Sequence, residues 1–396
     1  MAFLLSWEQR KLGECGETFT GLSGKTKDDF GHGDARFVTY MNVFSNPIAD
    51  KEKVEAVEID KSQNCVQYGD VFFTTSSETP EEVGMSCVWL ENTENTYLNS
   101  FCFGYRPTIN IDPYFMAYVL RSETVRKKIV FLAQGISRYN ISKNKVMEIE
   151  IPLPSIREQQ LLGKYFDNLD NLITLHQRKC DETKKLKKYM LQKMFPKNGE
   201  QFPEIRFEGF TDAWEQRKLS DVVDVYDGVH QTPEYKDEGI MFLSVENIAT
   251  LKSEKYISEE AFERDYKIYP EKGDILMTRI GDIGTPNVVE TAEKVAFYVS
   301  LALLKPHGID SYFLNNAIQS KSFQKGLRER SLLTAIPMKI NKDEIGKVDV
   351  CIPKNIDEQK EIGKAFKGLD NLITLHQRKA DRLKEFKKYM LKNMFV

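Results

Sequence analysis

Apolar residues recur every three to four positions along two long stretches of the chain, at 156–196 and 356–396. This spacing places them on one stripe of an α-helix, and over several turns it predicts a heptad seam at which helices pack together. We expect two long helices that pack against each other at these positions. The seam residues are Leu162, Phe166, Leu169, Ile173, His176, Cys180, Thr183, Lys187, Met190 and Met194, then Ile362, Phe366, Leu369, Ile373, His376, Ala380, Leu383, Lys387, Met390 and Met394.

Both predicted helices carry a signal for where they begin. Ser155 with Glu158, and Asn355 with Glu358, match a capping box, in which each side chain bonds to the backbone of the other residue. Pro196 ends the first helix, because proline cannot donate the next backbone hydrogen bond. At 1.5 Å per residue, a helix of about 39 residues is about 58 Å long.

The two predicted helices are close copies of each other. LDNLITLHQRK at 169–179 returns unchanged at 369–379, and 23 of 33 positions match between 163–195 and 363–395. The identity includes polar positions off the seam, although packing needs only apolar side chains of suitable volume. One partner bound once by each copy would explain it; a plain dimerisation stalk and recent recombination are alternatives. The expected docking residues are Asp170, Thr174, Gln177, Arg178, Asp370, Thr374, Gln377 and Arg378.

The sequence outside the helices predicts two α/β domains, at 1–155 and 214–355, with a connector at 197–213. WEQRKL opens the first at 7–12 and the second at 214–219. Alternating and β-branched runs at 36–40, 54–59 and 70–74 predict strands, and 271–279 is predicted to be a turn that enters a strand. Residues 113–131 predict a helix.

In the first domain, two polar stretches are candidates for DNA contact. Hydroxyl, amide and guanidinium groups are the groups that bind base edges and phosphates. The candidates are Thr75, Ser76, Ser77, Ser137, Arg138, Tyr139 and Asn140. Two ordinary solvated loops are the alternative.

In the second domain, a glycine-containing turn and a basic helix are the corresponding candidates. Glycines let the backbone approach a ligand closely, and arginine can bind a base or a phosphate. The candidates are Arg279, Gly281, Asp282, Arg328, Arg330 and Lys339. A solvated helix face is the alternative for the basic residues.

The bulk composition limits the class of protein only loosely. The net charge of −3 argues weakly against a nucleic-acid partner, but basic residues can gather on one face. Six scattered cysteines without a CxxC pair indicate a reducing compartment, which we expect to be the cytoplasm. The N-terminus lacks the pattern of a signal peptide, and no apolar run is long enough to span a membrane.

A direct search for catalytic motifs finds none. The five histidines form no HxxxH pair, and there is no GxSxG, no Cys/His arrangement, no metal-ligand spacing and no phosphate-binding GK[ST]. Residues 112–115 (DPYF) resemble an amino-methyltransferase motif but lack its second proline, and no glycine-rich cofactor strand accompanies them. We predict that the chain is not catalytic by itself and holds no metal or cofactor.

The order of domain, helix, domain and helix resembles the specificity subunit of bacterial Type I restriction-modification systems. The residues that carry the resemblance are Glu158-Gln159 and Glu358-Gln359, the proline segments at 151–154 and 351–353 before the helices, GDIL at 273–276, and FEGF at 207–210 ahead of the second WEQRKL. The sequence before the first WEQRKL lacks such a lead-in. Together these pieces extend over essentially the whole chain.

The resemblance implies a fold and a set of partners. Each domain would be a target-recognition domain that reads one half of a split site in double-stranded DNA. The two helices, packed as an antiparallel coiled coil with pseudo-two-fold symmetry, would set the gap between the halves. Two modification subunits would dock on the helices, and restriction subunits would complete the complex. S-adenosylmethionine, ATP and Mg²⁺ would belong to those partner subunits.

Two other functions remain open at this point. A coiled-coil scaffold or DNA-binding regulator would carry two ligand-binding domains without any modification subunit. A self-sufficient methyltransferase would bind S-adenosylmethionine itself.

For DNA reading, we predict that Arg138→Ala relaxes or weakens one half-site and that Arg279→Ala does so at the other. Each loss should be about 1–3 kcal/mol if the arginine contacts a base through two hydrogen bonds. Binding assays on altered half-sites measure this, and an equal loss on every sequence would instead mark phosphate contacts.

Overall fold

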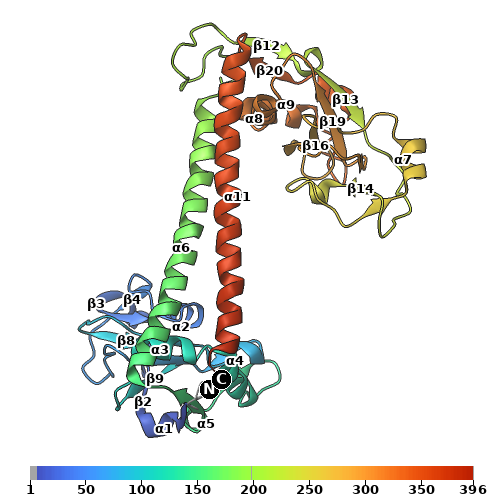
Figure 1. Cartoon of the computed structure of the whole chain (residues 1–396). Coiled ribbons are helices and arrows are strands. Elements are labelled where there is room, and N and C mark those ends of the chain that lie inside the picture. The colour runs from blue at the N-terminus through green and yellow to red at the C-terminus, as the bar shows by residue number, and fades with distance from the viewer. Residues whose placement is uncertain (1–6, 198, 396) are drawn as a thin grey trace. The chain divides into compact units, whose positions relative to one another are not determined.

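The computed structural model describes residues 7–197 and 199–395, and the chain divides into two compact units. Unit 1 joins the chain up to Gln177 with the chain from Arg378 onward, and unit 2 is Arg178–Gln377. Each unit thus contains one domain, the first part of the helix that follows it and the last part of the other helix (Figure 1). The units divide within the helices, not at the predicted domain boundaries. Residues 1–6, part of the N-terminus used in the signal-peptide argument, lie outside the described residues.

Unit 1 holds a four-stranded antiparallel sheet, β2-β9-β5-β7, a three-stranded sheet, β4-β3-β8, and two short pairs, β1-β11 and β6-β10. Its elements are β1 (Glu8–Lys11), α1 (Leu12–Cys15), β2 (Gly16–Thr20), β3 (Phe30–Val38), α2 (Tyr40–Ser45), β4 (Val54–Val57), β5 (Val71–Thr74), β6 (Ser76–Ser77), β7 (Ser86–Val88), β8 (Thr96–Leu98), β9 (Cys102–Pro107), α3 (Pro113–Val119), α4 (Glu123–Phe131), β10 (Tyr139–Asn140), α5 (Lys143–Met147) and β11 (Glu150–Leu153).

Unit 2 repeats this topology, with the sheets β13-β19-β16-β17 and β15-β14-β18 and the pair β12-β20. The two domains therefore share one fold although their sequences differ, and the prediction of α/β domains is confirmed. The elements are β12 (Glu215–Lys218), β13 (Val223–Asp227), β14 (Ile240–Leu243), β15 (Tyr256–Ile257), α7 (Glu259–Asp265), β16 (Ile275–Thr278), β17 (Pro286–Val288), β18 (Val295–Phe297), β19 (Leu301–Pro306), α8 (Ser311–Ile318), α9 (Lys321–Arg330), α10 (Lys342–Gly346) and β20 (Asp349–Ile352).

Capping residues explain two differences from the predicted elements. The expected strand at 36–40 ends at Val38, because the side chain of Thr39 accepts a hydrogen bond from the Asn42 N–H and so starts α2. The expected helix at 113–131 is two helices, since Ser122 caps a new one by accepting from the Val125 N–H. Short polar side chains therefore set these boundaries.

The two long helices are α6 (Ile156–Lys193) and α11 (Ile356–Asn393), and the predicted seam positions are all buried or half-buried. In unit 1 the Phe166 and Phe395 ring centroids are 5.4 Å apart, and Asp170 pairs with Lys387. In unit 2 the same relation joins Phe366 with Phe195, and Asp370 with Lys187. Within each unit, residues of increasing number along one helix contact residues of decreasing number along the other. The two helical segments therefore pack antiparallel.

The glutamates of the expected capping boxes have another role. The Glu158 N–H does donate to Ser155 Oγ at 3.4 Å, but the Glu158 carboxylate accepts the indole N–H of Trp7 at 3.2 Å. In unit 2 the Glu358 carboxylate accepts from Trp214 at the same distance and from Arg206 at 2.7 Å. The tryptophan of the repeated WEQ motif and the glutamate of the repeated EQ motif therefore recur because they bond to each other, which joins each domain to its helix.

The glutamine of each EQ pair ties the helix to the next element of its domain. The Gln159 amide oxygen accepts the Asp112 N–H at 3.0 Å, while its amide nitrogen donates to the Pro154 carbonyl at 2.8 Å. Gln359 makes the equivalent contacts in unit 2. A Cβ on Gly163 would lie 2.6 Å from the Phe115 backbone nitrogen, so only glycine permits this approach of α6 to α3.

One phenylalanine closes the core of each unit. In unit 1 the ring centroid of Phe395 lies 6.3 Å from that of Trp7 and 5.8 Å from that of Phe115. In unit 2 the Phe195 centroid lies 6.0 Å from Trp214 and 5.7 Å from Phe313. Each of these phenylalanines is at most 5% exposed. The end of each long helix thus completes the core around the domain that precedes the other helix.

We predict that Phe395→Ala lowers the free energy of unfolding of unit 1 by about 3–5 kcal/mol, as expected for removing a buried aromatic ring. Phe386→Ala, on the same helix but 43% exposed, is the matched control and should change stability little. Hydrogen exchange of unit 1 and unit 2 amides measures the two units separately. Equal loss of protection in both variants would contradict the closing role of Phe395.

Candidate nucleic-acid interface and partner surface

A hairpin follows α4 in unit 1 and α9 in unit 2, and each is held at its base by backbone hydrogen bonds. In unit 1, Gln134 and Asn140 exchange N–H···O bonds of 3.0 and 2.8 Å, and β10 pairs with β6. In unit 2, the Leu332 N–H donates to the Lys339 carbonyl at 2.8 Å, and the Ile340 N–H donates to the Arg279 carbonyl at 3.0 Å. We call these segments, 134–140 and 332–339, the recognition hairpins.

Of the DNA-contact candidates at 75–77, Ser76 and Ser77 are buried and Thr75 is half-buried. Ser76 and Ser77 are each 6% exposed because they form β6 under the first recognition hairpin. The Ser76 carbonyl accepts the Tyr40 hydroxyl at 2.7 Å, and Thr75 Oγ1 donates to the Phe101 carbonyl at 2.8 Å. Thr75, Ser76 and Ser77 therefore bond through their backbone to the base of the hairpin.

The first recognition hairpin itself is open to solvent, as expected. Ser137, Arg138 and Asn140 are exposed, and Tyr139 is half-buried. The hairpin's backbone is fixed at its base, so these side chains are presented from a defined position. An arginine guanidinium with its fork of donors fits either a guanine edge or a phosphate.

Arg279 does not face a ligand. Its side chain is buried, its Nε donates to the Ile340 carbonyl at 3.0 Å, and its guanidinium forms an ion pair with Asp227. Burial also lowers the pKa of Arg279 from its ordinary value. The expectation of a base or phosphate contact is therefore replaced by a structural one: Arg279 joins β13 to the base of the second recognition hairpin.

Gly281 and Asp282 lie at the surface but already have partners. The Gly281 N–H donates to the Met338 carbonyl of the hairpin at 2.8 Å, and its φ of 82° is the left-handed conformation that glycine tolerates. The Asp282 carboxylate accepts the Thr285 hydroxyl at 2.6 Å. Both residues shape the turn that carries the hairpin.

The cationic candidates of the second domain lie on α9 and at the hairpin. Arg328 and Lys339 are exposed. Arg330 is half-buried, with its Nη1 3.6 Å from the Glu344 carboxylate, so part of its charge is offset within the domain. Of the candidates in unit 2, Arg328 and Lys339 are the most available to an anionic ligand.

Charge segregation extends these interfaces beyond the residues singled out from sequence. Residues 124–147 contain six Lys and Arg but no Asp or Glu, and 324–342 contain five against Glu329 alone. Arg126 donates to buried carbonyls, whereas Lys143 and Lys145 lie exposed just after the hairpin. These two lysines were missed, although the acid-free run was visible in the sequence. A local basic surface thus coexists with a net charge of −3.

On the helices, Asp170 and Asp370 contact this chain itself. Asp170 accepts from Lys387 at 2.7 Å and from the Tyr118 hydroxyl at 2.9 Å, and Asp370 pairs with Lys187 at 2.7 Å. Their identity in the two copies therefore has an intrachain cause, which was not among the explanations considered from sequence. Both carboxylates are thus engaged within the chain, and their docking of a partner stays a prediction.

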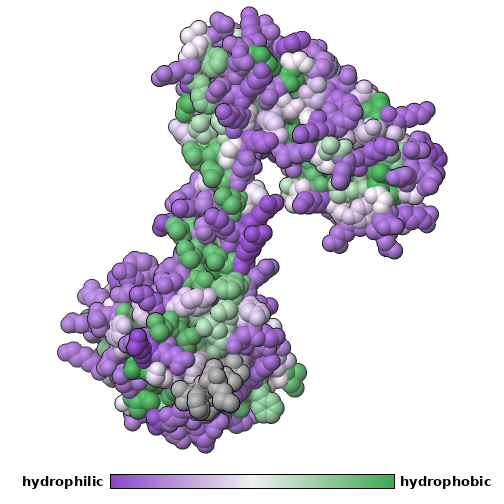
Figure 2. All heavy atoms as spheres, in the orientation of Figure 1, coloured by the Kyte–Doolittle hydropathy of each residue, from purple (hydrophilic) through white to green (hydrophobic). Residues whose placement is uncertain are grey.

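The other expected docking residues are exposed: Thr174, Gln177, Arg178, Thr374, Gln377 and Arg378. Large apolar side chains accompany them at repeated helix positions, with Leu172 43% exposed and Leu372 46% exposed. Leu186, Tyr189, Leu375, Phe386 and Tyr389 are also exposed. Figure 2 shows apolar surface, in green, along the helices. Exposed apolar rows on a helix are typical of a protein-binding surface.

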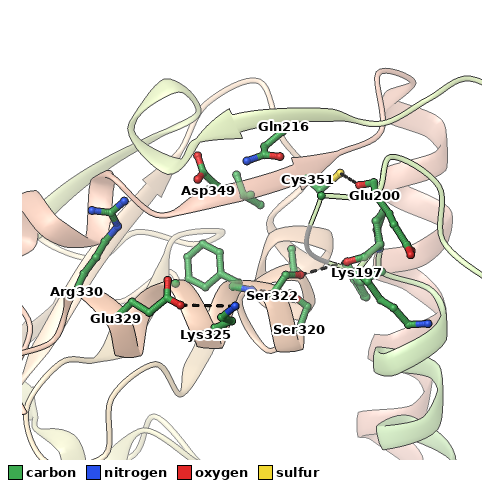
Figure 3. A pocket seen from close by; sticks show the side chains of 17 residues that line it. Lys197, Glu200, Gln216, Ser320, Ser322, Lys325, Glu329, Arg330, Asp349 and Cys351 are labelled. Atoms are coloured by element: carbon green, nitrogen blue, oxygen red, sulfur yellow. Dashed lines mark hydrogen bonds and ion pairs between the residues drawn. The ribbon is translucent and has the colours of Figure 1, made fainter.

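A small cleft of about 140 Å³ in unit 2 offers no catalytic arrangement (Figure 3). Its lining includes Lys325, whose Nζ is 3.7 Å from the Glu329 carboxylate, and Ser322, whose hydroxyl donates to the Pro196 carbonyl at 3.2 Å. Burial raises the pKa of the Cys351 thiol to about 11, so it stays protonated at neutral pH. The cleft lining contains no histidine to act as a base.

Three further observations concern the classes of function considered from sequence. Asp112 of the DPYF segment accepts the Phe115 N–H at 2.9 Å and so caps α3. Within 7–197 and 199–395, no group of three His, Cys, Asp or Glu is placed to hold a metal ion. Across the same residues, no helix is both long and apolar enough to cross a membrane.

Comparison with known proteins finds a family and several relatives. Residues 5–185 and 211–385 match the family described as Type I restriction modification DNA specificity domain. The MjaVIII Type I restriction enzyme specificity subunit of Methanocaldococcus jannaschii is 24% identical over 296 residues, which cover 71% of this chain and 69% of that one. The MjaX specificity subunit of the same organism is 24% identical over 413 residues, covering 97% and 92%.

The fold also resembles that of a solved structure. The Type I restriction-modification S subunit from M. genitalium superposes with a TM-score of 0.68 at 16% sequence identity, covering 100% of this chain and 98% of that one. At this level of identity the likeness concerns the fold.

The revised role of Arg279 gives a prediction that separates it from Arg138. Arg279→Ala should lower the free energy of unfolding of unit 2 by about 3 kcal/mol, because it removes one partner of a buried ion pair. Arg138→Ala, at an exposed position, should stay within about 0.5 kcal/mol of the parent. Thermal unfolding of the two variants measures this. An unchanged melting temperature for Arg279→Ala would restore it as a candidate DNA contact.

Proposed function

The chain belongs to the family of the Type I restriction modification DNA specificity domain, and we propose that each of its two domains reads one half of a split DNA site. It is a specificity subunit, which recognises DNA within a complex and carries no catalytic step of its own. The scaffold and self-sufficient methyltransferase alternatives are not favoured.

The observation that best supports two reading sites is the recurrence of a recognition hairpin in both domains. Each hairpin is anchored by backbone hydrogen bonds and lies in a locally basic stretch of chain. The hairpin sequences differ, QGISRYN against LLTAIPMK, whereas the framework beneath them has one topology. Two different readers on one framework would recognise two different half-sites. Base contacts from Ser137, Arg138, Tyr139 and Asn140 would select one of them.

The helices are proposed to bind the modification subunits, one copy on each repeated surface. The exposed residues around Leu172 and Leu372 have the same neighbours in both copies, so one kind of partner fits both. S-adenosylmethionine would then be bound by the modification subunits, and ATP and Mg²⁺ by restriction subunits where these are present. The modification subunits would methylate an adenine of the site, which would be flipped into the pocket of the modification subunit. A complex acting on the host's DNA would work in the bacterial cytoplasm.

Co-expression with a Type I modification subunit, followed by mapping of N6-methyladenine across the host genome, tests the function directly. We expect one split motif methylated on both strands, because two readers joined in one chain recognise two half-sites at a fixed spacing. Size-exclusion chromatography of the purified complex provides the control that assembly occurred. An assembled complex that leaves no split motif would contradict the proposal.

The partner surface predicts a stepwise change in stoichiometry. Leu172→Asp should remove one modification subunit from the complex, Leu372→Asp the other, and the double variant both, since a charge at an apolar contact is costly to bury. Mass photometry counts the subunits. Asp181→Ala, a polar position of the same helix, is the control. Two modification subunits on the double variant would exclude this surface.

A further inference from the structure

The tip of each recognition hairpin carries an isoleucine that is fully open to solvent. Ile136 is 96% exposed and Ile336 is 101% exposed, the two highest values for large apolar side chains in the described part of the chain. A single exposed aliphatic side chain is common on protein surfaces and needs no explanation. Two of them at the same place in two domains whose hairpin sequences differ are a recurrent feature.

Backbone hydrogen bonds fix the base of each hairpin, so the backbone that leads to each isoleucine starts from a defined position. In unit 1, Tyr139 and Asn140 pair with Ser77 and Ser76, and the Ile141 N–H donates to the Thr75 carbonyl at 3.0 Å. In unit 2, the Gly281 N–H and the Arg279 carbonyl bond to either end of the hairpin's second strand. A buried residue follows each hairpin, Ile141 at 7% exposure and Ile340 at 0%.

The charge around the tips identifies the kind of surface they face. Arg138 lies two residues after Ile136, Lys143 and Lys145 follow, and the whole stretch 124–147 contains no acidic residue. In 324–342, the stretch that contains Ile336, the exposed cations are Lys325, Arg328, Lys339 and Lys342, against Glu329 as the one acidic residue. An apolar side chain surrounded by cations matches DNA, in which a stack of apolar base faces lies between two rows of phosphates.

We propose that Ile136 and Ile336 insert as apolar wedges between neighbouring base pairs, one in each half-site, while the flanking cations hold the phosphates. This inference rests on the proposed function and names the contact by which each domain deforms its DNA. Aliphatic side chains inserted at a base step unstack it and bend the duplex, which favours steps that unstack easily. Each isoleucine thereby adds sequence preference without a hydrogen bond to a base.

Fluorescence of 2-aminopurine, which rises when the base unstacks, tests the wedge. The full chain is assembled with its modification subunits and bound to a duplex carrying the split motif obtained by methylation mapping. The probe is placed in turn at positions of each half-site, but not at the methylated adenine, whose flipping would give a signal of its own. Ile136→Ser, Ile336→Ser, Ile136→Leu and the control Phe131→Ser are compared with the parent. Phe131, 88% exposed at the end of α4, lies outside the hairpin.

The expected result is a signal confined to one step in each half-site. Ile136→Ser should abolish it in one half-site and keep it in the other, Ile336→Ser should do the reverse, and binding should weaken about tenfold in each. Ile136→Leu should retain the signal, because leucine is also an apolar wedge. Phe131→Ser should match the parent in both signal and affinity.

Three outcomes would overturn the wedge. They are parental unstacking and affinity in both serine variants, a parent complex that binds its site without unstacking any labelled step, and loss of modification subunits from the serine variants in the absence of DNA. The last result would assign the tips to a protein partner. All three outcomes are measured on DNA that carries the methylated split motif, so each can contradict the wedge while the proposed specificity function still holds. If no split motif is found, the proposed specificity function itself is contradicted.

Discussion

The packing of one phenylalanine at the end of each long helix is the interaction on which both units depend. Phe395 lies among Trp7, Phe115 and Phe166 in unit 1, and Phe195 occupies the same place in unit 2. Burying such a ring contributes about 2–3 kcal/mol, and each well-oriented aromatic pair adds about 0.5–1.5 kcal/mol. Because α11 begins in unit 2 and ends in unit 1, neither core is complete without both helices.

The residues that recur between the two halves serve this framework. The Trp7–Glu158 and Trp214–Glu358 hydrogen bonds join domain to helix, Gln159 and Gln359 bind the next turn of their domains, and Gly163 allows the helix to approach. The recognition hairpins, by contrast, share a position and a backbone anchor but not a sequence. The hairpin residues thus lie apart from the residues that hold the framework together. The hairpins can therefore differ between the two domains while the packing beneath them stays the same, as is needed if the two domains read different half-sites.

The sequence predicted the framework better than the site, for identifiable physical reasons. The seam of α6 and α11 follows from periodicity alone, and its burial agrees position by position. Burial of single polar residues depends instead on tertiary pairing. Ser76 and Ser77 pair with β10, and Arg279 forms an ion pair with Asp227 at the end of β13. Neither contact leaves a local sequence signal. Asp170 looked like a docking residue because its partner Lys387 is distant in sequence. The exposed isoleucines were missed because one apolar residue in a loop has no periodic pattern.

Whether each domain carries its own half of the specificity is measured by the methylation motif of a chain in which residues 214–355 are replaced by residues 7–155. We expect a symmetric split motif, with the half-site read by the first domain present twice in inverted orientation and the spacer unchanged. That result would show that each domain carries its own half of the specificity and that the helices set the distance. A motif that keeps the half-site of the replaced domain, from a complex that demonstrably assembles, would contradict the account.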